Sequence, residues 1–223
     1  MRNKIFIAID TNSQKKAMSI IKNSKIKNFK IGYKFGLEFL NSKNGRKFIA
    51  KLKNKIIFLD LKLHDIPNTL SSALLALKDL KINYLTVHIS SGLKALKRLK
   101  RVSGKIKIVG VTTLTSLDNG DLKSIGYKKT LKDIIISQTK LAKKAKLDAI
   151  VCSPLDVKFV KKFFDKEIIT PGIRISSKVD DQKRVMTPKS AFNQGSDWLV
   201  IGRALTKGNI KRNFKILSDH LNR

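Results

Sequence analysis

Short apolar runs alternate with longer segments of helical period along this 223-residue chain, and that alternation limits its fold more than any other feature. Each run has the length of a core strand and is followed by polar or glycine residues. The runs that we interpret as strands are residues 4–9, 29–32, 56–61, 84–88, 106–111, 149–152, 167–170 and 198–201.

Amphipathic segments lie between the predicted strands. The clearest is 131–146, which places lysines on one face of a helix and apolar side chains on the other. A final helix is expected over residues 205–221, where it would close the chain. The residues predicted near the apolar face of the first of these helices are Leu131, Ile134, Ile135, Gln138, Leu141, Ala142 and Ala145.

The number of β–α alternations favours a (β/α)₈ barrel, with a doubly wound open sheet as the alternative. The chain has the size of one domain, and no linker, repeat or low-complexity segment divides it. We therefore expect a single barrel domain over residues 1–223.

In either fold, functional residues gather at the carboxyl ends of the strands, so polar residues should follow the apolar runs. They do so at nearly every run, more regularly than solvated loops would. The residues in question are Asp10, Lys30, Asp60, Lys62, His88, Thr112, Thr115, Arg174, Gly202 and Arg203.

The most informative segment is Asp60-Leu61-Lys62-Leu63-His64-Asp65-Ile66-Pro67-Asn68-Thr69, which directly follows a buried run. Side chains alternate along a strand, so Asp60 and Lys62 project to one face, and a turn could bring Asp65 back to them. Such a charged cluster is costly to bury unless its members are paired. Taken alone, the pattern fits an ordinary ion pair as well as it fits a catalytic site.

The complete segment closely resembles the active-site signature of the orotidine 5′-phosphate decarboxylase family, whose members make uridine monophosphate (UMP) in pyrimidine synthesis. The resemblance extends over nearly the whole chain. The other matching positions are Asp10 in the first strand, Lys30 in the second, Thr115 after the fifth, the stretch 170–174 with Gln182 after the seventh, and Gly202 with Arg203 at the eighth.

The resemblance implies loss of CO₂ from C6 of the orotate ring with no cofactor and no metal. Preorganised charge must then stabilise a carbanion. We expect Lys62 to deliver the proton to C6, since an arginine would not readily give one up. Asp60 and Asp65 are expected to keep Lys62 protonated and in place.

The resemblance also assigns residues to the parts of the substrate. Asp10 and Lys30 would hold the ribose, Thr115 would face the pyrimidine, and Gln182 would bridge pyrimidine and phosphate. Gly202 and Arg203 would bind the phosphate, because glycine lets the backbone approach and arginine binds in bidentate fashion. For Arg174, substrate binding and a loop salt bridge remain equally open.

In the family, the positions of Asp65, Ile66 and Thr69 reach across to the partner subunit's site. The resemblance therefore implies a homodimer with shared active sites.

Some related sugar-phosphate synthases and decarboxylases share the D-x-K-x-x-D pattern but use Mg²⁺ with an acidic residue on the second strand. We assign that position here to Lys30, which would repel a cation. The continuation Ile66-Pro67-Asn68-Thr69 also favours orotidine 5′-phosphate as substrate.

The formal net charge of +32 at pH 7 raises a different hypothesis, a basic nucleic-acid-binding module. The basic residues are distributed from end to end, and no run exceeds two, which favours compositional bias on a solvated surface. We therefore expect no specific nucleic-acid partner.

The chain shows no unbroken apolar stretch of membrane-spanning length and no signal-peptide pattern. Its one cysteine, Cys152, is expected to be a small core residue. These features predict a cytoplasmic protein without a membrane partner.

Overall fold

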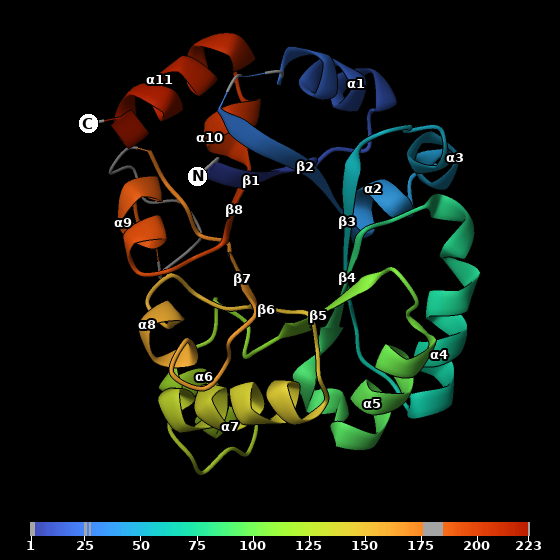
Figure 1. Ribbon diagram of the computed structural model, residues 1–223, viewed down its shortest axis with the longest axis vertical. Helices are drawn as coiled ribbons and strands as arrows, with labels where there is room; N and C mark the ends of the chain where they lie inside the picture. Colours follow the sequence, from blue (N-terminus) through green and yellow to red (C-terminus); the bar gives the residue numbers. More distant parts are fainter. Residues whose placement is uncertain (1–2, 25, 27, 176–184, 223) are drawn as a thin grey trace.

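Eight parallel strands close into a barrel in chain order, with β1 paired to β8 (Figure 1). The computed structural model describes residues 3–24, 26, 28–175 and 185–222. The strands are β1 (Asn3–Ala8), β2 (Phe29–Gly36), β3 (Ile56–Leu63), β4 (Tyr84–His88), β5 (Lys107–Val111), β6 (Ala149–Val151), β7 (Glu167–Thr170) and β8 (Trp198–Ile201). The predicted (β/α)₈ barrel is confirmed, and the open sheet is excluded because β1 and β8 pair.

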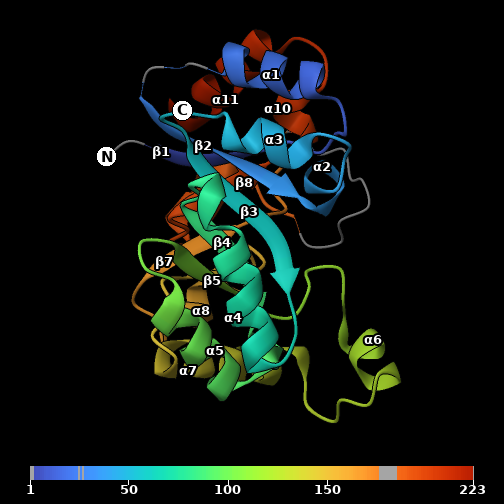
Figure 2. The same ribbon diagram turned by 90° about the vertical axis from the view of Figure 1, so that its right-hand side faces the viewer.

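Helices surround the barrel and connect its strands (Figures 1 and 2). Figure 2 shows α6 projecting away from the body of the barrel. The helices are α1 (Gln14–Asn23), α2 (Leu37–Leu40), α3 (Gly45–Ala50), α4 (Pro67–Ala76), α5 (Leu93–Val102), α6 (Asn119–Ser124), α7 (Leu131–Lys144), α8 (Val157–Val160), α9 (Pro188–Asn193), α10 (Arg203–Thr206) and α11 (Ile210–Asn222), with 3₁₀ turns η1 (Lys78–Leu80) and η2 (Ile89–Ser91).

The predicted amphipathic helix is present as α7. The Thr130 side chain caps it by accepting a hydrogen bond from the backbone N–H of Asp133, and Ile134, Ile135 and Ala142 are buried. The single final helix predicted over residues 205–221 is wrong. It is divided into α10 and α11, and Gly208, between them, has a φ of 68°, which a continuing right-handed helix cannot accommodate.

The predicted end of the second strand is also wrong, because β2 continues past Gly32 to Gly36. A glycine usually weakens a strand, but this one has a packing role. A Cβ on Gly32 would lie 2.5 Å from the Phe6 ring, so only glycine leaves room for that ring inside the barrel.

Two apolar cores flank the sheet. The larger lies between strands and helices and includes Cys152, which is fully buried as predicted. The smaller fills the barrel and is mainly aromatic at its base. Its buried members are Phe6, Ala8, Phe58, Tyr84, Val109, Ala149, Ile169, Trp198 and Val200.

The amino end of the barrel is closed by rings and a carboxylate. Phe6 stacks on Trp198 with centroids 4.1 Å apart, and Tyr84 meets Phe6 edge-on. Glu167 accepts hydrogen bonds from Tyr84 Oη at 3.0 Å, Lys107 Nζ at 2.8 Å and Trp198 Nε1 at 3.3 Å. We call Glu167, Lys107, Tyr84, Trp198 and Phe6 the basal cluster.

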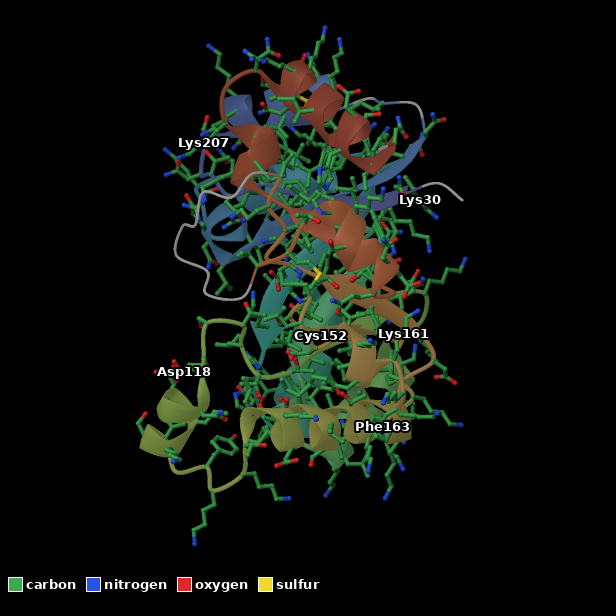
Figure 3. All side chains as sticks on the ribbon, turned by 90° about the vertical axis from the view of Figure 1, so that its left-hand side faces the viewer. Lys30, Asp118, Cys152, Lys161, Phe163 and Lys207 are labelled. Carbon is green, nitrogen blue, oxygen red and sulfur yellow. The ribbon has the colours of Figure 1, made fainter. Side chains whose placement is uncertain are left out.

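Lysine side chains are distributed around the molecule. Figure 3 shows nitrogen-tipped side chains on all sides, with Lys30, Lys161 and Lys207 at separate places on the outline. Within the described part of the chain, none of the helices combines the length and apolar character needed to cross a membrane.

Candidate active site

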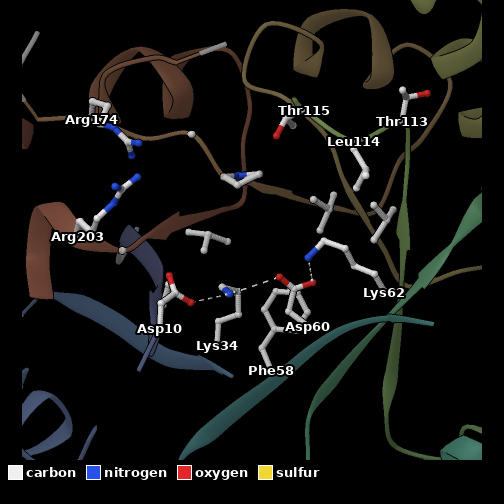
Figure 4. Close-up of a pocket in the computed structure, with 17 residues that line it drawn as sticks. Asp10, Lys34, Phe58, Asp60, Lys62, Thr113, Leu114, Thr115, Arg174 and Arg203 are labelled. Atoms are coloured by element: carbon white, nitrogen blue, oxygen red, sulfur yellow. Dashed lines mark hydrogen bonds and ion pairs between the residues drawn. The ribbon is translucent and has the colours of Figure 1, made fainter. Parts of the chain in front are cut away.

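A pocket of about 280 Å³ opens at the end of the barrel where the strands finish (Figure 4). Its base is formed by Phe58, Val111 and Val200 from the barrel interior. Its charged residues come from β2, β3 and the segments that follow β1, β7 and β8, and they are Asp10, Lys34, Asp60, Lys62, Arg174 and Arg203.

Four of these side chains form a row of alternating charge, which Figure 4 shows along one wall. Lys34 Nζ lies 3.4 Å from Asp10 Oδ1 and 3.4 Å from Asp60 Oδ2. Asp60 Oδ1 lies 2.9 Å from Lys62 Nζ. The inner pair is shielded, with side-chain exposures of 13% for Lys34 and 14% for Asp60, whereas 39% of the Lys62 side chain is exposed. Lys62 is therefore the ammonium that is offered to a ligand.

The two inner groups hold each other in the charged state. Burial by itself would raise the pKa of Asp60, but Lys34 and Lys62, with hydrogen bonds from Lys62 and Thr86, lower the pKa below its ordinary value. Burial would likewise lower the pKa of Lys34, and the carboxylates of Asp60 and Asp10 outweigh it and raise the pKa. The Asp60–Lys34 pair therefore stays charged across the neutral pH range.

The assignment of Lys30 to this network is wrong. Lys30 is exposed near the amino end of β2, where it pairs along the sheet with Lys4. Lys34 pairs with Ala8 and Phe58 at the pocket and makes the contacts expected of Lys30. The error follows from ending β2 at Gly32, because a strand continuing to Gly36 carries Lys34 to the carboxyl end.

An irregularity in β3 places Lys62. Leu59 pairs with Leu85 and Leu63 with Val87, so the three residues 60–62 stand opposite Thr86 alone. Lys62 has a φ of 48°, a left-handed conformation that is uncommon for a residue with a side chain. This bulge brings Asp60 and Lys62 together on the pocket wall.

The loop after β5 forms another wall. Figure 4 shows the Thr115 hydroxyl turned toward the pocket and that of Thr113 turned away. Gln138 of α7 holds the loop, since its Oε1 accepts hydrogen bonds from Thr113 N–H at 2.9 Å and Thr113 Oγ1 at 3.3 Å. Gln138, predicted near the apolar face of this helix, is half-buried and serves as a polar anchor for this loop.

Two arginines lie across the pocket from the charged row. Arg203 is the first residue of α10, and Gly202 before it also lines the pocket. Arg174 follows β7, and its Nε is buried without a hydrogen-bond partner among the described residues. Figure 4 shows both guanidinium groups directed into the same space, so their charges converge on a site suited to an anion.

The chain is similar to known proteins over nearly its whole length. The family described as Orotidine 5′-phosphate decarboxylase / HUMPS family matches residues 3–213. The chain belongs to this family of enzymes. A relative from Wolbachia sp. subsp. Brugia malayi, named orotidine 5′-phosphate decarboxylase, is 44% identical over 217 residues, which cover 95% of both chains.

Solved structures of the family share the fold. Orotidine 5′-phosphate decarboxylase from Lactobacillus acidophilus superposes with a TM-score of 0.84 at 29% identity, covering 99% of this chain and 100% of that one. Orotidine 5′-monophosphate decarboxylase from Methanocaldococcus jannaschii, solved with the inhibitor BMP, gives a TM-score of 0.79 at 26% identity and covers 100% of both chains.

The remaining family positions lie elsewhere. Asp65, Ile66 and Thr69 are exposed on the segment from β3 into α4 and do not line the pocket of their own chain. Asp65 Oδ1 accepts a hydrogen bond from the backbone N–H of Ile66, which is 65% exposed. Gln182 lies outside the described residues.

The two histidines near the site form no metal centre. Ring centroids of His64 and His88 are 5.3 Å apart, and His64 Nε2 lies 3.3 Å from Ser90 Oγ. Burial lowers the pKa of His88, and His64 and Lys62 lower it further. Within the described residues, His, Cys, Asp and Glu side chains do not gather in threes that could hold a metal ion.

Proposed function

We propose that this chain is an orotidine 5′-phosphate decarboxylase that converts orotidine 5′-phosphate to UMP and CO₂. The observation that carries the proposal is the Asp10–Lys34–Asp60–Lys62 row facing a pocket whose other side holds Arg174 and Arg203. The substrate has an anion at each end, a carboxylate on the ring and a phosphate on the ribose, and the pocket offers cationic groups at both positions. Family membership supports the same reaction.

Lys62 is the proposed proton donor. As the C6–carboxylate bond breaks, its electron pair stays on C6 and CO₂ leaves. The Lys62 ammonium stabilises that charge and transfers a proton to C6, and solvent then reprotonates the lysine. Asp60 holds the ammonium at 2.9 Å, so the donor is positioned before the substrate arrives.

The other residues position the substrate. Arg203 and Arg174 bind the phosphate, and Gly202 leaves its side of the pocket open to the anion. The Thr115 hydroxyl faces the pyrimidine, and Asp10 and Lys34 bind the ribose hydroxyls. Gln182 is proposed to join pyrimidine and phosphate. Contacts remote from C6 then contribute to catalysis by fixing the ring against Lys62.

A Mg²⁺-dependent sugar-phosphate reaction is the alternative within the same family pattern. It would require an acidic residue on β2 where the chain has Lys34. The Lys34 ammonium lies between Asp10 and Asp60 and neutralises the carboxylates that a cation would need. This arrangement supports a metal-free reaction.

The exposed segment carrying Asp65, Ile66 and Thr69 supports a homodimer in which each chain completes its partner's site. Mixed dimers test this directly. Lys62→Ala and Asp65→Ala chains are each expected to be inactive, but a hybrid of the two contains one site with both residues. Random mixing should restore about a quarter of wild-type activity if the sites are shared, and no recovery would exclude sharing.

The reaction is tested by following the loss of orotidine 5′-phosphate absorbance with EDTA-treated enzyme. Rapid loss that the Lys62→Ala variant abolishes is expected. Turnover only after Mg²⁺ is added, or only with sugar phosphates, would contradict the proposal. The proposed setting is pyrimidine synthesis in the cytoplasm.

A further inference from the structure

The hydroxyl of Thr86 contacts both Asp60 and Lys62 in the β3 bulge. Thr86 is on β4, and none of its surface is exposed. Its Oγ1 accepts a hydrogen bond from the backbone N–H of Lys62 at 2.8 Å and donates one to Asp60 Oδ1 at 3.2 Å. The proton and a lone pair of one hydroxyl are thus both used at the pocket wall.

The backbone bond compensates for an interruption of the sheet. Regular pairing between β3 and β4 stops at Leu59 and resumes at Leu63, so the Lys62 N–H has left the regular ladder. A buried N–H without a partner is costly, and Lys62 also adopts a left-handed backbone conformation. The Thr86 side chain supplies the acceptor that this conformation requires.

The second bond orients the carboxylate. Asp60 Oδ1 receives both the Lys62 ammonium at 2.9 Å and the Thr86 hydroxyl, while Oδ2 faces Lys34. Without the hydroxyl, only the two lysines would restrain rotation of the carboxylate about its Cβ–Cγ bond, and its distances to both could change. Thr86 therefore acts on the backbone of Lys62 and on its partner at once.

We propose that Thr86 is a positioning residue that fixes the Lys62 ammonium for proton transfer without touching the substrate. This inference rests on the proposed function for the step that it serves. It predicts that losing the hydroxyl slows turnover while leaving substrate binding nearly intact. A displaced reacting group can cost about 100-fold in rate.

The test compares Thr86→Val, which keeps the shape and removes the hydroxyl, with Thr86→Ser, which keeps the hydroxyl. We expect kcat to fall about 10- to 100-fold in Thr86→Val with KM changed less than about threefold, and to recover largely in Thr86→Ser. Thr139→Val is the matched control. Thr139 is equally buried, and its hydroxyl bonds only within α7, to the carbonyl oxygen of Ile135.

The pH dependence of kcat distinguishes a positioning role of Thr86 from a general loosening of the structure. Since the Thr86 hydrogen bond is one of the interactions that lower the pKa of Asp60, its removal should move the acid limb of kcat to higher pH. The acid limb of Thr139→Val should match that of wild type. A Thr86→Val enzyme with wild-type kcat and pH profile would overturn the inference while leaving the proposed reaction intact.

A crystal structure of Thr86→Val decides the geometric claim without any substrate. We expect Lys62 to leave its left-handed conformation or its ammonium to move away from Asp60. An unchanged bulge would overturn the inference even if the enzyme acted on another substrate. Should Thr86→Val not fold, Thr86→Ala supports the same kinetic and structural comparison.

Discussion

The two ends of the barrel each hold a shielded carboxylate among lysines, but they use it differently. At the carboxyl end, Asp60 contacts Lys34 and Lys62 beside an open pocket. At the amino end, Glu167 contacts Lys107 and Lys4 above the stacked rings of Phe6 and Trp198. The elements of the two networks are alike, and their surroundings differ.

The difference lies in what occupies the space next to the carboxylate. Tyr84 and Trp198 donate to Glu167 in addition to Lys107, so the basal cluster has protein partners on several sides. Burial, together with the Glu167 carboxylate, raises the pKa of Tyr84 to about 12, which keeps that donor protonated. At the pocket, the corresponding space is left for a ligand. The comparison teaches that the same ion pairs can either close a barrel or prepare a site, depending on whether neighbouring side chains fill the gap.

Removing a lysine from each end should produce the largest contrast. Lys62→Ala is expected to lower kcat roughly 1,000-fold or more, because it deletes the proposed proton donor. Lys107→Ala should leave kcat per folded molecule near wild type. Steady-state kinetics with circular dichroism of both variants makes the comparison, and comparable activity in the two would refute the division of roles.

Neutralising Asp60 at one end and Glu167 at the other should give the next largest difference in kcat. Asp60→Asn should lower kcat by roughly 100-fold, since Lys62 loses its charged partner. Glu167→Gln should preserve kcat and lower the free energy of unfolding by roughly 1–3 kcal/mol through weakened charge-assisted hydrogen bonds. Denaturant unfolding measured beside kinetics separates the two effects. A large kcat loss in Glu167→Gln would show that the basal cluster reaches the chemistry.

The packing of Gly32 against Phe6 at the base of the barrel can be tested by adding a single carbon atom. Gly32→Ala places a Cβ 2.5 Å from the Phe6 ring, so the ring must shift. Such overpacking should cost about 1–3 kcal/mol of stability. Thermal unfolding of Gly32→Ala should show this loss. Gly36→Ala, on the same strand, controls for general glycine effects, because its φ is −94° and a Cβ there would lie no closer than 3.8 Å to another side chain. Equal losses in the two would remove the role assigned to the Phe6 contact.

Low pH should destabilise both ends of the barrel. The loss of stability for each carboxylate is expected to be the smallest of these effects. The pKa values of Asp60 and Glu167 are lowered from ordinary values of 3.8 and 4.5. Each carboxylate therefore contributes stability that is present above its ordinary value and is lost as pH falls through the lowered one. Unfolding free energies from about pH 3 to about pH 7 should fall on the acid side, less steeply in Glu167→Gln. Identical slopes would contradict the lowered pKa of Glu167.

Much of this architecture could be predicted from residue patterns, for identifiable reasons. The strands are short apolar runs, and Asp60, Lys62 and Arg203 directly follow such runs, where a parallel barrel places its functional residues. Local sequence does not distinguish Lys34 from Lys30, because the two residues lie on the same face of β2 by strand alternation and differ in their height along the strand. That height depends on where the strand ends, which local sequence does not determine.

Sequence patterns alone do not reveal the roles of Thr86 and Gln138. Thr86 sits within an apolar run and resembles any β-branched strand residue until the bulge in β3 places Lys62 opposite it. Gln138 carries no motif, and its role depends on the loop that follows a different strand. Contacts between segments distant in sequence decide both.

Gly32 also has a consequence for strand slippage. A strand can shift by two residues without exchanging its inward and outward faces, so the apolar pattern of β2 alone would tolerate such a shift. Phe6 now lies opposite Gly32, and a shift in either direction would bring Lys30 or Lys34 against that ring. A residue with no side chain at the base of the barrel thereby selects the alignment that pairs Lys34 with Ala8 and Phe58 and places its Nζ 3.4 Å from both Asp10 and Asp60.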